Sequence, residues 1–336
     1  MKLFDEQVAR KPNLYPWTQD FINSMWEGHW TPNEFKFKSD LHDYKTRLTE
    51  EERQIVVRTL SAIGQIEIAV KTFWARLGDN FRHPSMVDMG IVMSGIEVIH
   101  NVAYEKLLVV LGLSDAFEDN LKIDVINGRV KYLRKYTDKV YKDNKKQYIY
   151  ALILFTLFVE NISLFSQFYV ILWFGRYKNV LKDTNNQVAY TKNEELIHAR
   201  IGVKLINTLR KEYPELFDAE LEARVLHEAN EALIAESNII DWILGKYYGE
   251  NLNAHILKDY VKGRIAESLD AIGFVVPEMY NISEESKKSI QWMNEEVLGS
   301  NMKDFFDGKS VDYGKNNKSY EEGELFADES NIHVVK

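Results

Sequence analysis

The sequence predicts an all-α helical bundle that encloses a dinuclear metal site made of carboxylates and imidazoles. Two pairs carry this prediction: Glu97 with His100, and Glu195 with His198. The two residues of each pair are three positions apart in the sequence, so both side chains project from one face of a helix. Two such helices, with one glutamate from each of two further helices, form the ligand set of a dinuclear site in a four-helix bundle. Apolar residues recur at helical spacing, and only 6 prolines interrupt 336 residues.

Both lone glutamates that this ligand set requires are present. Glu67 lies within an apolar run, and Glu160 is the only charged residue between 147 and 175. A buried, unpaired carboxylate costs on the order of several kcal/mol, so each must be protonated, paired or bound to metal. Glu67 and Glu97 are 30 residues apart, and Glu160 and Glu195 are 35 apart. This order predicts two helical hairpins, each supplying a lone glutamate and a Glu-x-x-His pair.

The expected helices follow the apolar periodicity and the residues that typically start and end a helix. Thr49 and Glu52 predict a capping box at the start of the first bundle helix, and Gly112 follows the second. The helices are expected at 49–78, 84–111, 120–138, 147–175, 187–210, 218–248, 253–271 and 285–297. Three parts are expected: an aromatic N-terminal segment 1–45 that packs on the bundle, the helical domain 46–300, and a flexible C-terminal tail 301–336.

The stretch 147–175 is long and apolar enough to span a membrane. Asn161, Ser163 and Gln167 interrupt it, however, and a glutamate at its centre would be costly in lipid. We therefore expect a helix surrounded by other helices in a large bundle, and no membrane partner.

Composition narrows the function further. A formal net charge of −9 argues against nucleic acid as the main partner. The chain has no cysteine, which excludes disulfides, thiolate metal sites and any redox-active thiol of its own. Because the N-terminal residues lack an apolar signal core, a cytoplasmic location is expected.

A Glu-x-x-His pair taken alone is more often a solvated helical contact than a pair of metal ligands. The apolar surroundings and the ordering over four helices favour the metal site here. The other histidines are expected to be non-ligands: His29, His42, His83, His227, His255 and His333.

At these residues the chain resembles the small, radical-generating subunit of class I ribonucleotide reductase, from about Trp17 to the tail. The resemblance implies a ferritin-like bundle and a homodimer. It also implies two metal positions, with Glu67, Glu97 and His100 on the first and Glu160, Glu195 and His198 on the second. Tyr104, one helical turn after His100, matches the tyrosine that becomes a radical in many members. Trp30 matches the tryptophan of the radical-transfer route, and Glu194 stands where an aspartate commonly links that tryptophan to the histidine.

The tail also has counterparts in that family. Tyr313 or Tyr320 is similar to the mobile tyrosine that passes the oxidising equivalent onward, and spacing leaves both open. The residues around Phe326 resemble the segment that docks on the large (alpha) subunit. A solvated, disordered end remains the alternative interpretation of the tail.

The metal pair stays open at the level of sequence. Glu67 stands where the better-known di-iron members carry aspartate, and it resembles the manganese-using subclasses. Because Tyr104 is also kept, the combination favours two manganese ions, with Fe/Fe or Mn/Fe as alternatives, since these donors accept both metals. Lys71, one turn beyond Glu67, could tune a ligand or attract an anionic oxidant. It could equally form an exposed helical pair with Glu67.

The function expected from the resemblance is that of a ribonucleoside-diphosphate reductase small subunit. The oxidised metal pair, with or without a Tyr104 radical, would supply the large subunit with a radical equivalent for deoxyribonucleotide synthesis. The main alternative is a self-contained oxidase or oxygenase on the same scaffold, which would need neither Trp30 nor the tail. A ferritin-like iron store is the second alternative.

Overall fold

Helices form the framework of the described residues. The computed structural model describes residues 1–129 and 144–299, with side chains for all of these except 67–71 and 298–299. Residues Met1–Val297 make up a single unit. Apart from an isolated antiparallel bridge between Gly249 and Leu252, these described residues contain no strand pairing. The predicted all-α class is confirmed.

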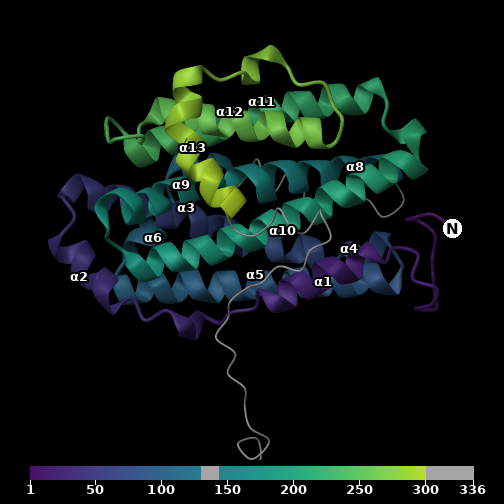
Figure 1. The fold of residues 1–336 in the computed structure, drawn as a ribbon, viewed down its shortest axis with the longest axis horizontal. Helices are drawn as coiled ribbons and strands as arrows, with labels where there is room; N and C mark the ends of the chain where they lie inside the picture. Colours follow the sequence, from purple (N-terminus) through teal and green to yellow (C-terminus); the bar gives the residue numbers. More distant parts are fainter. Residues whose placement is uncertain (130–143, 300–336) are drawn as a thin grey trace, which may run out of the picture. The chain divides into compact units, whose positions relative to one another are not determined.

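The first helical hairpin consists of α3 (Glu50–Ala75) and α5 (Pro84–Leu111), which pack along each other (Figure 1). Thr49 and Glu52 form the predicted capping box: the Thr49 amide donates to Oε2 of Glu52 at 3.0 Å, and the Glu52 amide donates to the Thr49 hydroxyl at 3.2 Å. Gly112 ends α5 in the left-handed region, with φ of 72°. The short helix α4 (Leu77–Asn80) connects the two.

The second hairpin pairs one continuous apolar helix with α10 (Lys182–Glu212). The apolar helix consists of α8 (Lys145–Leu154), the π-helical stretch η2 (Phe155–Ser163), α9 (Phe165–Trp173) and the π-helical stretch η3 (Phe174–Lys178). η2 packs against α10 at Gly202, where a Cβ atom would collide with the side chain of Thr156. Glycine at this position therefore allows α10 to approach η2 closely.

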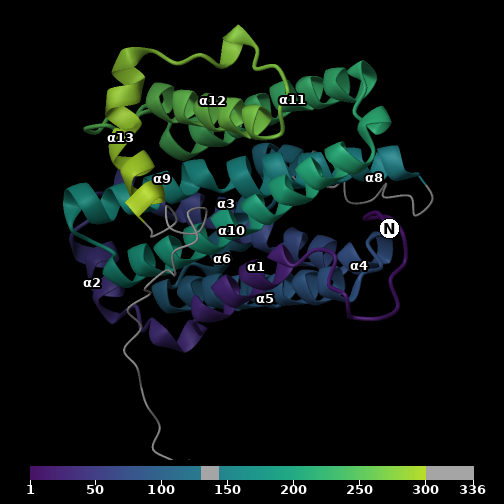
Figure 2. The ribbon, with the colours of Figure 1, turned by 45° about the vertical axis from the view of Figure 1, so that its right-hand side comes forward.

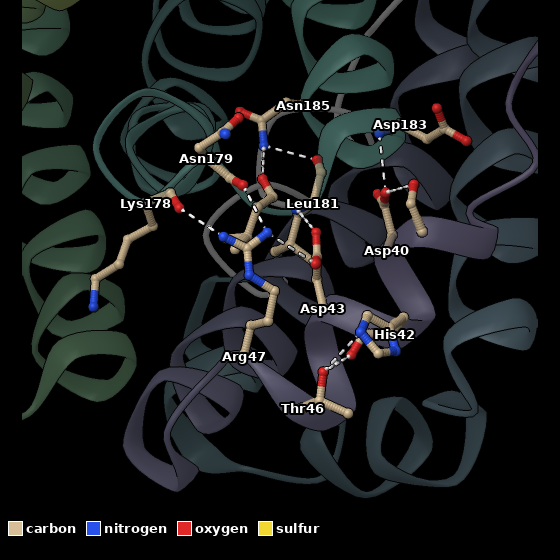
Figure 3. Close-up of polar contacts among 12 residues, drawn as sticks. Asp40, His42, Asp43, Thr46, Arg47, Lys178, Asn179, Leu181, Asp183 and Asn185 are labelled. Atoms are coloured by element: carbon tan, nitrogen blue, oxygen red, sulfur yellow. Dashed lines mark hydrogen bonds and ion pairs between the residues drawn. The ribbon is translucent and has the colours of Figure 1, made fainter.

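Acidic side chains from α2 (Lys38–Thr46) hold the start of α10, as Figure 3 shows. Oδ2 of the fully buried Asp40 accepts from both the amide and the hydroxyl of Thr184 at 2.7 Å, and its Oδ1 accepts from the Asp183 amide at 3.1 Å. The Asp183 carboxylate in turn accepts from two backbone amides just before α2. A carboxylate at a helix N-terminus satisfies free amides and complements the helix dipole. These contacts fix where α10 begins.

Further helices cover the bundle. α11 (Ala219–Leu244) and α12 (Ala254–Ala271) lie side by side in both views, and α12 packs against η2 (Figures 1 and 2). α1 (Trp17–Glu27) packs against α5 and α10. The other elements are η1 (Pro32–Glu34), α6 (Ser114–Asn120), η4 (Pro214–Leu216), η5 (Glu278–Tyr280) and α13 (Glu284–Gly299).

Two helical stretches among the described residues are long and apolar enough to cross a membrane by length and composition. In Lys145–Lys178, 94% of the most apolar window is buried inside the protein, which agrees with the predicted helix in the interior of a bundle. In Pro84–Leu111 only 44% of the corresponding window is buried. One face of α5 is therefore apolar and uncovered in the single chain.

The N-terminal region and one connection differ from the sequence prediction. α1 and α2 are helices of 11 and 9 residues where only an aromatic segment was expected. Helices this short depend on tertiary packing, so local sequence signals them weakly. In the helix expected at 120–138, residues 121–123 form a turn and 124–129 are helical, while the rest lies outside the described residues. The helix expected to reach 248 ends at Leu244, because Gly245 has φ of 56°.

Candidate metal centre

Five buried side chains from the two hairpins meet in the interior. Glu97 and His100 come from α5, Glu160 from η2, and Glu195 and His198 from α10, and none is more than 1% exposed. Ligand atoms of four of them, all except His100, lie within 4.8 Å of one another. The fold thus brings both Glu-x-x-His pairs and one of the lone glutamates to one place.

Both imidazoles turn Nδ1 toward the carboxylates. Nδ1 of His100 lies 3.4 Å from Oε2 of Glu97 and 3.1 Å from Oε1 of Glu195. Nδ1 of His198 lies 2.9 Å from Oε1 of Glu97 and 3.6 Å from Oε2 of Glu195. Each of these two carboxylates presents one oxygen to each histidine. These two carboxylates and two imidazoles would together hold two metal ions.

Burial and mutual proximity shift the acidity of this group. The pKa of Glu160 is raised well above its usual range, first by burial and then by the charge of Glu195. Burial also acts to raise the pKa of Glu195, but hydrogen bonds from Glu160, His100 and His198 bring it below the usual range. Burial acts to lower the pKa of His198, yet Glu97 and the other carboxylates raise it well above the usual range. Divalent cations bound here would compete with protons for these carboxylates and imidazoles.

The donor set fits a dinuclear transition-metal site. Carboxylate oxygens and imidazole nitrogens are ligands that manganese and iron share, so the donors leave the choice between these metals open. Glu67, the remaining predicted ligand, lies on α3 together with Lys71. The side chains of both residues are outside the described part of the structure.

A hydrogen-bonded line leads out of the ligand group on the His100 side. Nε2 of His100 lies 2.7 Å from Oε2 of Glu194, and the same oxygen accepts from Nε1 of Trp30 at 2.7 Å. The rings of Trp30 and His100 are stacked, with centroids 6.2 Å apart. The longer side chain of Glu194, where aspartate is common in the family that the sequence resembles, therefore still reaches both partners.

Tyr104 lies one helical turn after His100 on α5 and is 1% exposed. Its side chain borders a pocket of about 320 Å³ between α3, α5 and α6, whose lining also includes Gly64, Leu108 and Phe117. The tail residues Tyr313, Tyr320 and Phe326 lie outside the described residues.

The structure adds a contact that the sequence analysis missed. Nε1 of the fully buried Trp74 donates to Oε1 of Glu160 at 2.6 Å, and the Trp74 ring lies 6.4 Å from that of His198. Its place on α3, seven residues after Glu67, puts it two helical turns along the same face. That spacing from Glu67 was the one signal in the sequence that could have placed Trp74 at the ligand group.

Two buried arginines hold η2, the π-helical stretch that carries Glu160. Nε of Arg264, from α12, donates to the carbonyl of Asn161 at 2.6 Å. Arg129 donates to the carbonyl of Ser163 and to Oε1 of Gln167. A π-helical stretch has a different pattern of backbone hydrogen bonds from an α-helix, and guanidinium groups can satisfy carbonyls that it leaves available. Neither arginine has a sequence signature, because each acts through residues distant in the chain.

Sequence comparison agrees with the resemblance that the motifs indicated. Residues 8–288 match the family model described as "Ribonucleotide reductase, small chain". A probable ribonucleoside-diphosphate reductase small subunit of Invertebrate iridescent virus 3 is 24% identical over 332 residues, covering 94% of this chain and 86% of the relative. A ribonucleoside-diphosphate reductase subunit beta of Chlamydia pneumoniae is 22% identical, covering 90% of this chain and 88% of the relative.

Solved structures share the fold. The ribonucleotide reductase R2 subunit from Clostridium botulinum matches with a TM-score of 0.79 and 18% identity, covering 88% of this chain and 94% of that one. A mutant R2-like ligand-binding oxidase with an anaerobically reconstituted Mn/Fe cofactor matches with a TM-score of 0.68 and 17% identity. The match covers 80% of this chain and 98% of that one.

Replacing Glu194 with glutamine tests its role behind His100. The substitution keeps the shape of the side chain but removes the charge that orients the imidazole. We expect metal binding to weaken by about 10- to 100-fold, measured by competition with a chelator. Glu228→Gln is the matched control, because Glu228 is also buried but accepts from Tyr150 at 3.1 Å instead. Equal losses of metal affinity in both variants would show that Glu194 does not act on the metal site through His100.

Proposed function

The chain belongs to the ribonucleotide reductase small-chain family, and we propose that it stores a one-electron oxidising equivalent and passes it to a separate large subunit. The large subunit uses that equivalent to begin converting ribonucleoside diphosphates to deoxyribonucleotides. The observation that carries the proposal is the hydrogen-bonded line from His100 through Glu194 to Trp30. Because the chain has no cysteine, any thiol chemistry falls to its partner.

We assign two transition-metal ions per chain to the ligand group. The proposed ligands are Glu67, Glu97, His100, Glu160, Glu195 and His198. When bound, the ions supply one-electron redox chemistry at a potential that side chains alone do not reach. Two manganese ions are the proposed pair, on the ground that Glu67 and Tyr104 occur together, and Fe/Fe and Mn/Fe are the alternatives.

The residues of the relay have separate roles. With Nδ1 of His100 facing the ligand group, Nε2 carries the hydrogen that is donated to Glu194. Glu194 accepts from both rings through one oxygen, so it orients His100 and Trp30 together. An indole that has lost an electron is far more acidic at its N–H than the neutral ring, and Oε2 of Glu194 is within hydrogen-bond reach to hold that proton. Tyr104, buried on the same helix as His100, is the proposed alternative store of the equivalent.

The fold likeness to the R2-like ligand-binding oxidase makes a self-contained oxidase the second candidate. Such an enzyme needs its substrate at the metal ions and has no use for a relay that leads away from them. The contacts of Trp30 and Glu194 therefore favour the reductase subunit.

We propose that the tail 301–336 docks on the large subunit, with residues around Phe326 as the anchor. One of Tyr313 and Tyr320 would carry the equivalent across. This proposal rests on the resemblance of the tail to that of the family and on its polar composition, which is typical of a segment that orders on binding.

We further propose that the chain forms a homodimer through α5. Ile91, Val98, Val102 and Val109 are between 45% and 61% exposed and follow one another at spacings of seven, four and seven residues. That spacing places them along one helical face, and an exposed apolar stripe of this length is typical of an interface between protein chains. A second copy of the same face would bury it symmetrically.

Replacing Trp30 with phenylalanine tests the relay. The variant keeps an apolar ring but loses the N–H and the easily oxidised indole. We expect reduction of ribonucleoside diphosphates to fall by at least about 100-fold with metal content unchanged, measured with purified large subunit from the same source. Wild-type turnover in this variant would contradict the proposed route. Turnover of a small-molecule substrate without a large subunit would favour the oxidase.

Metal analysis combined with EPR on one sample from the native source tests the metal assignment. We expect two ions per chain, both manganese, with a signal from a coupled pair. Two iron ions with a tyrosyl signal would make Tyr104 the store of the equivalent and overturn the manganese assignment. Protein purified without chelators that holds no metal would contradict the whole ligand group.

Replacing Val98 with glutamate tests the homodimer. A charge at the centre of an apolar interface is costly to bury, so dissociation to a 39.3 kDa monomer is expected in light scattering after size exclusion. Ile234→Glu is the control, because Ile234 is 49% exposed on α11, away from this stripe. The α5 interface is wrong if both variants remain dimers, or if the wild-type chain is itself monomeric.

A further inference from the structure

A buried arginine joins the two helices that carry the lone glutamates. Arg129 is 1% exposed. Its Nη1 donates to the carbonyl of Ala62 on α3 at 3.1 Å, five residues before Glu67. Its Nη2 donates to the carbonyl of Ser163 on η2, three residues after Glu160. One guanidinium group therefore ties the backbone of α3 to the backbone of η2, within about one and a half turns of each glutamate.

A second buried charge holds that guanidinium in place. Oε1 of Glu236, which is 1% exposed on α11, lies 3.1 Å from Nε of Arg129. Gln167 of α9 contacts both partners: its Oε1 accepts from Arg129 at 3.0 Å, and its Nε2 donates to Oε2 of Glu236 at 3.5 Å. The ion pair of Arg129 and Glu236 thus joins α3, η2, α9 and α11 at one point in the interior.

Stability alone gives little reason to keep an ion pair at this place. Taking two charges out of water costs free energy that their mutual attraction barely offsets, so apolar side chains of similar size are often as stable or more stable. A guanidinium, however, presents its N–H donors in a rigid, planar fork. Hydrogen bonds from that fork to two backbones fix a separation that apolar packing leaves more adjustable.

We propose that Arg129 and Glu236 are positioning residues for the metal centre, because together they set the separation of α3 and η2. Glu67 and Glu160 approach the metal ions from these two helices, so their placement depends on the ion pair. The inference rests on the proposed function only in taking these two glutamates as ligands. It needs neither the relay through Trp30 nor the large subunit.

The test compares three variants of the full chain loaded with Mn²⁺. Glu236→Gln leaves a buried guanidinium without its counterion, so both the melting temperature and the metal affinity should fall. The double variant Arg129→Met with Glu236→Leu removes both charges, and its melting temperature should return to about the wild-type value. We expect the double variant nevertheless to bind Mn²⁺ about ten-fold more weakly in competition with a chelator. The EPR signal of its coupled Mn²⁺ pair should also differ in shape from that of the wild type.

Arg129→Lys is the third variant, and it keeps the result decisive if the double variant does not fold. A lysine retains the charge opposite Glu236, but a single ammonium group lacks the planar fork that reaches both backbones. We therefore expect Arg129→Lys to fold and to show the same ten-fold loss of affinity. Glu52→Gln is the matched control and should bind Mn²⁺ as the wild type does. Glu52 is also a buried carboxylate, paired with Lys178, but it lies about four turns before Glu67 on α3.

Wild-type metal affinity and an unchanged coupled signal in the double variant or in Arg129→Lys would overturn the inference. A loss of affinity that simply follows the melting temperature in every variant, the control included, would overturn it as well. Both readouts are made without the large subunit. Weaker metal binding at an unchanged melting temperature therefore supports the positioning role even if the wild-type chain does not sustain ribonucleotide reduction, and the two failures can be told apart.

Discussion

Negative charge buried in an apolar interior is the constraint on which the rest of the structure depends. Glu97, Glu160 and Glu195 are 0–1% exposed, and the imidazoles of His100 and His198 stand among their oxygens. Carboxylates in such a setting are unstable unless protons or cations neutralise them. The group is thus a built cation site. Its geometry, with two carboxylates each facing both histidines, is suited to two ions.

Contacts along α10 and η2 keep these side chains in position. Asp40 fixes the start of α10, about three turns before Glu195. Gly202, one turn after His198, lets α10 lie close to η2. On the other side of η2, Arg264 holds the carbonyl of the residue after Glu160. Glu160 is therefore placed by backbone contacts as well as by its own hydrogen bond from a tryptophan.

Each histidine of the site has a tryptophan beside it, but the two tryptophans lie in different surroundings. Trp74, near His198, packs edge-on against Phe155 and Phe73 in the interior. Trp30, near His100, reaches a tyrosine at the surface. Aromatic contacts therefore lead from His100 to the surface on the Trp30 side, whereas these contacts of Trp74 stay in the interior.

The sequence by itself determined the helical class, the two hairpins and both Glu-x-x-His pairs. These signals are local. Helical spacing, capping residues and a lone glutamate in an apolar run can be recognised without knowing which distant residues lie nearby in the fold. Only the tertiary structure decided the π-helical turn at Glu160, the contact of Trp74, the arginines behind η2 and the place of Tyr190 beside Trp30. Each of these joins residues that are distant in sequence, and no local pattern encodes which distant side chain fills a given space in a packed interior.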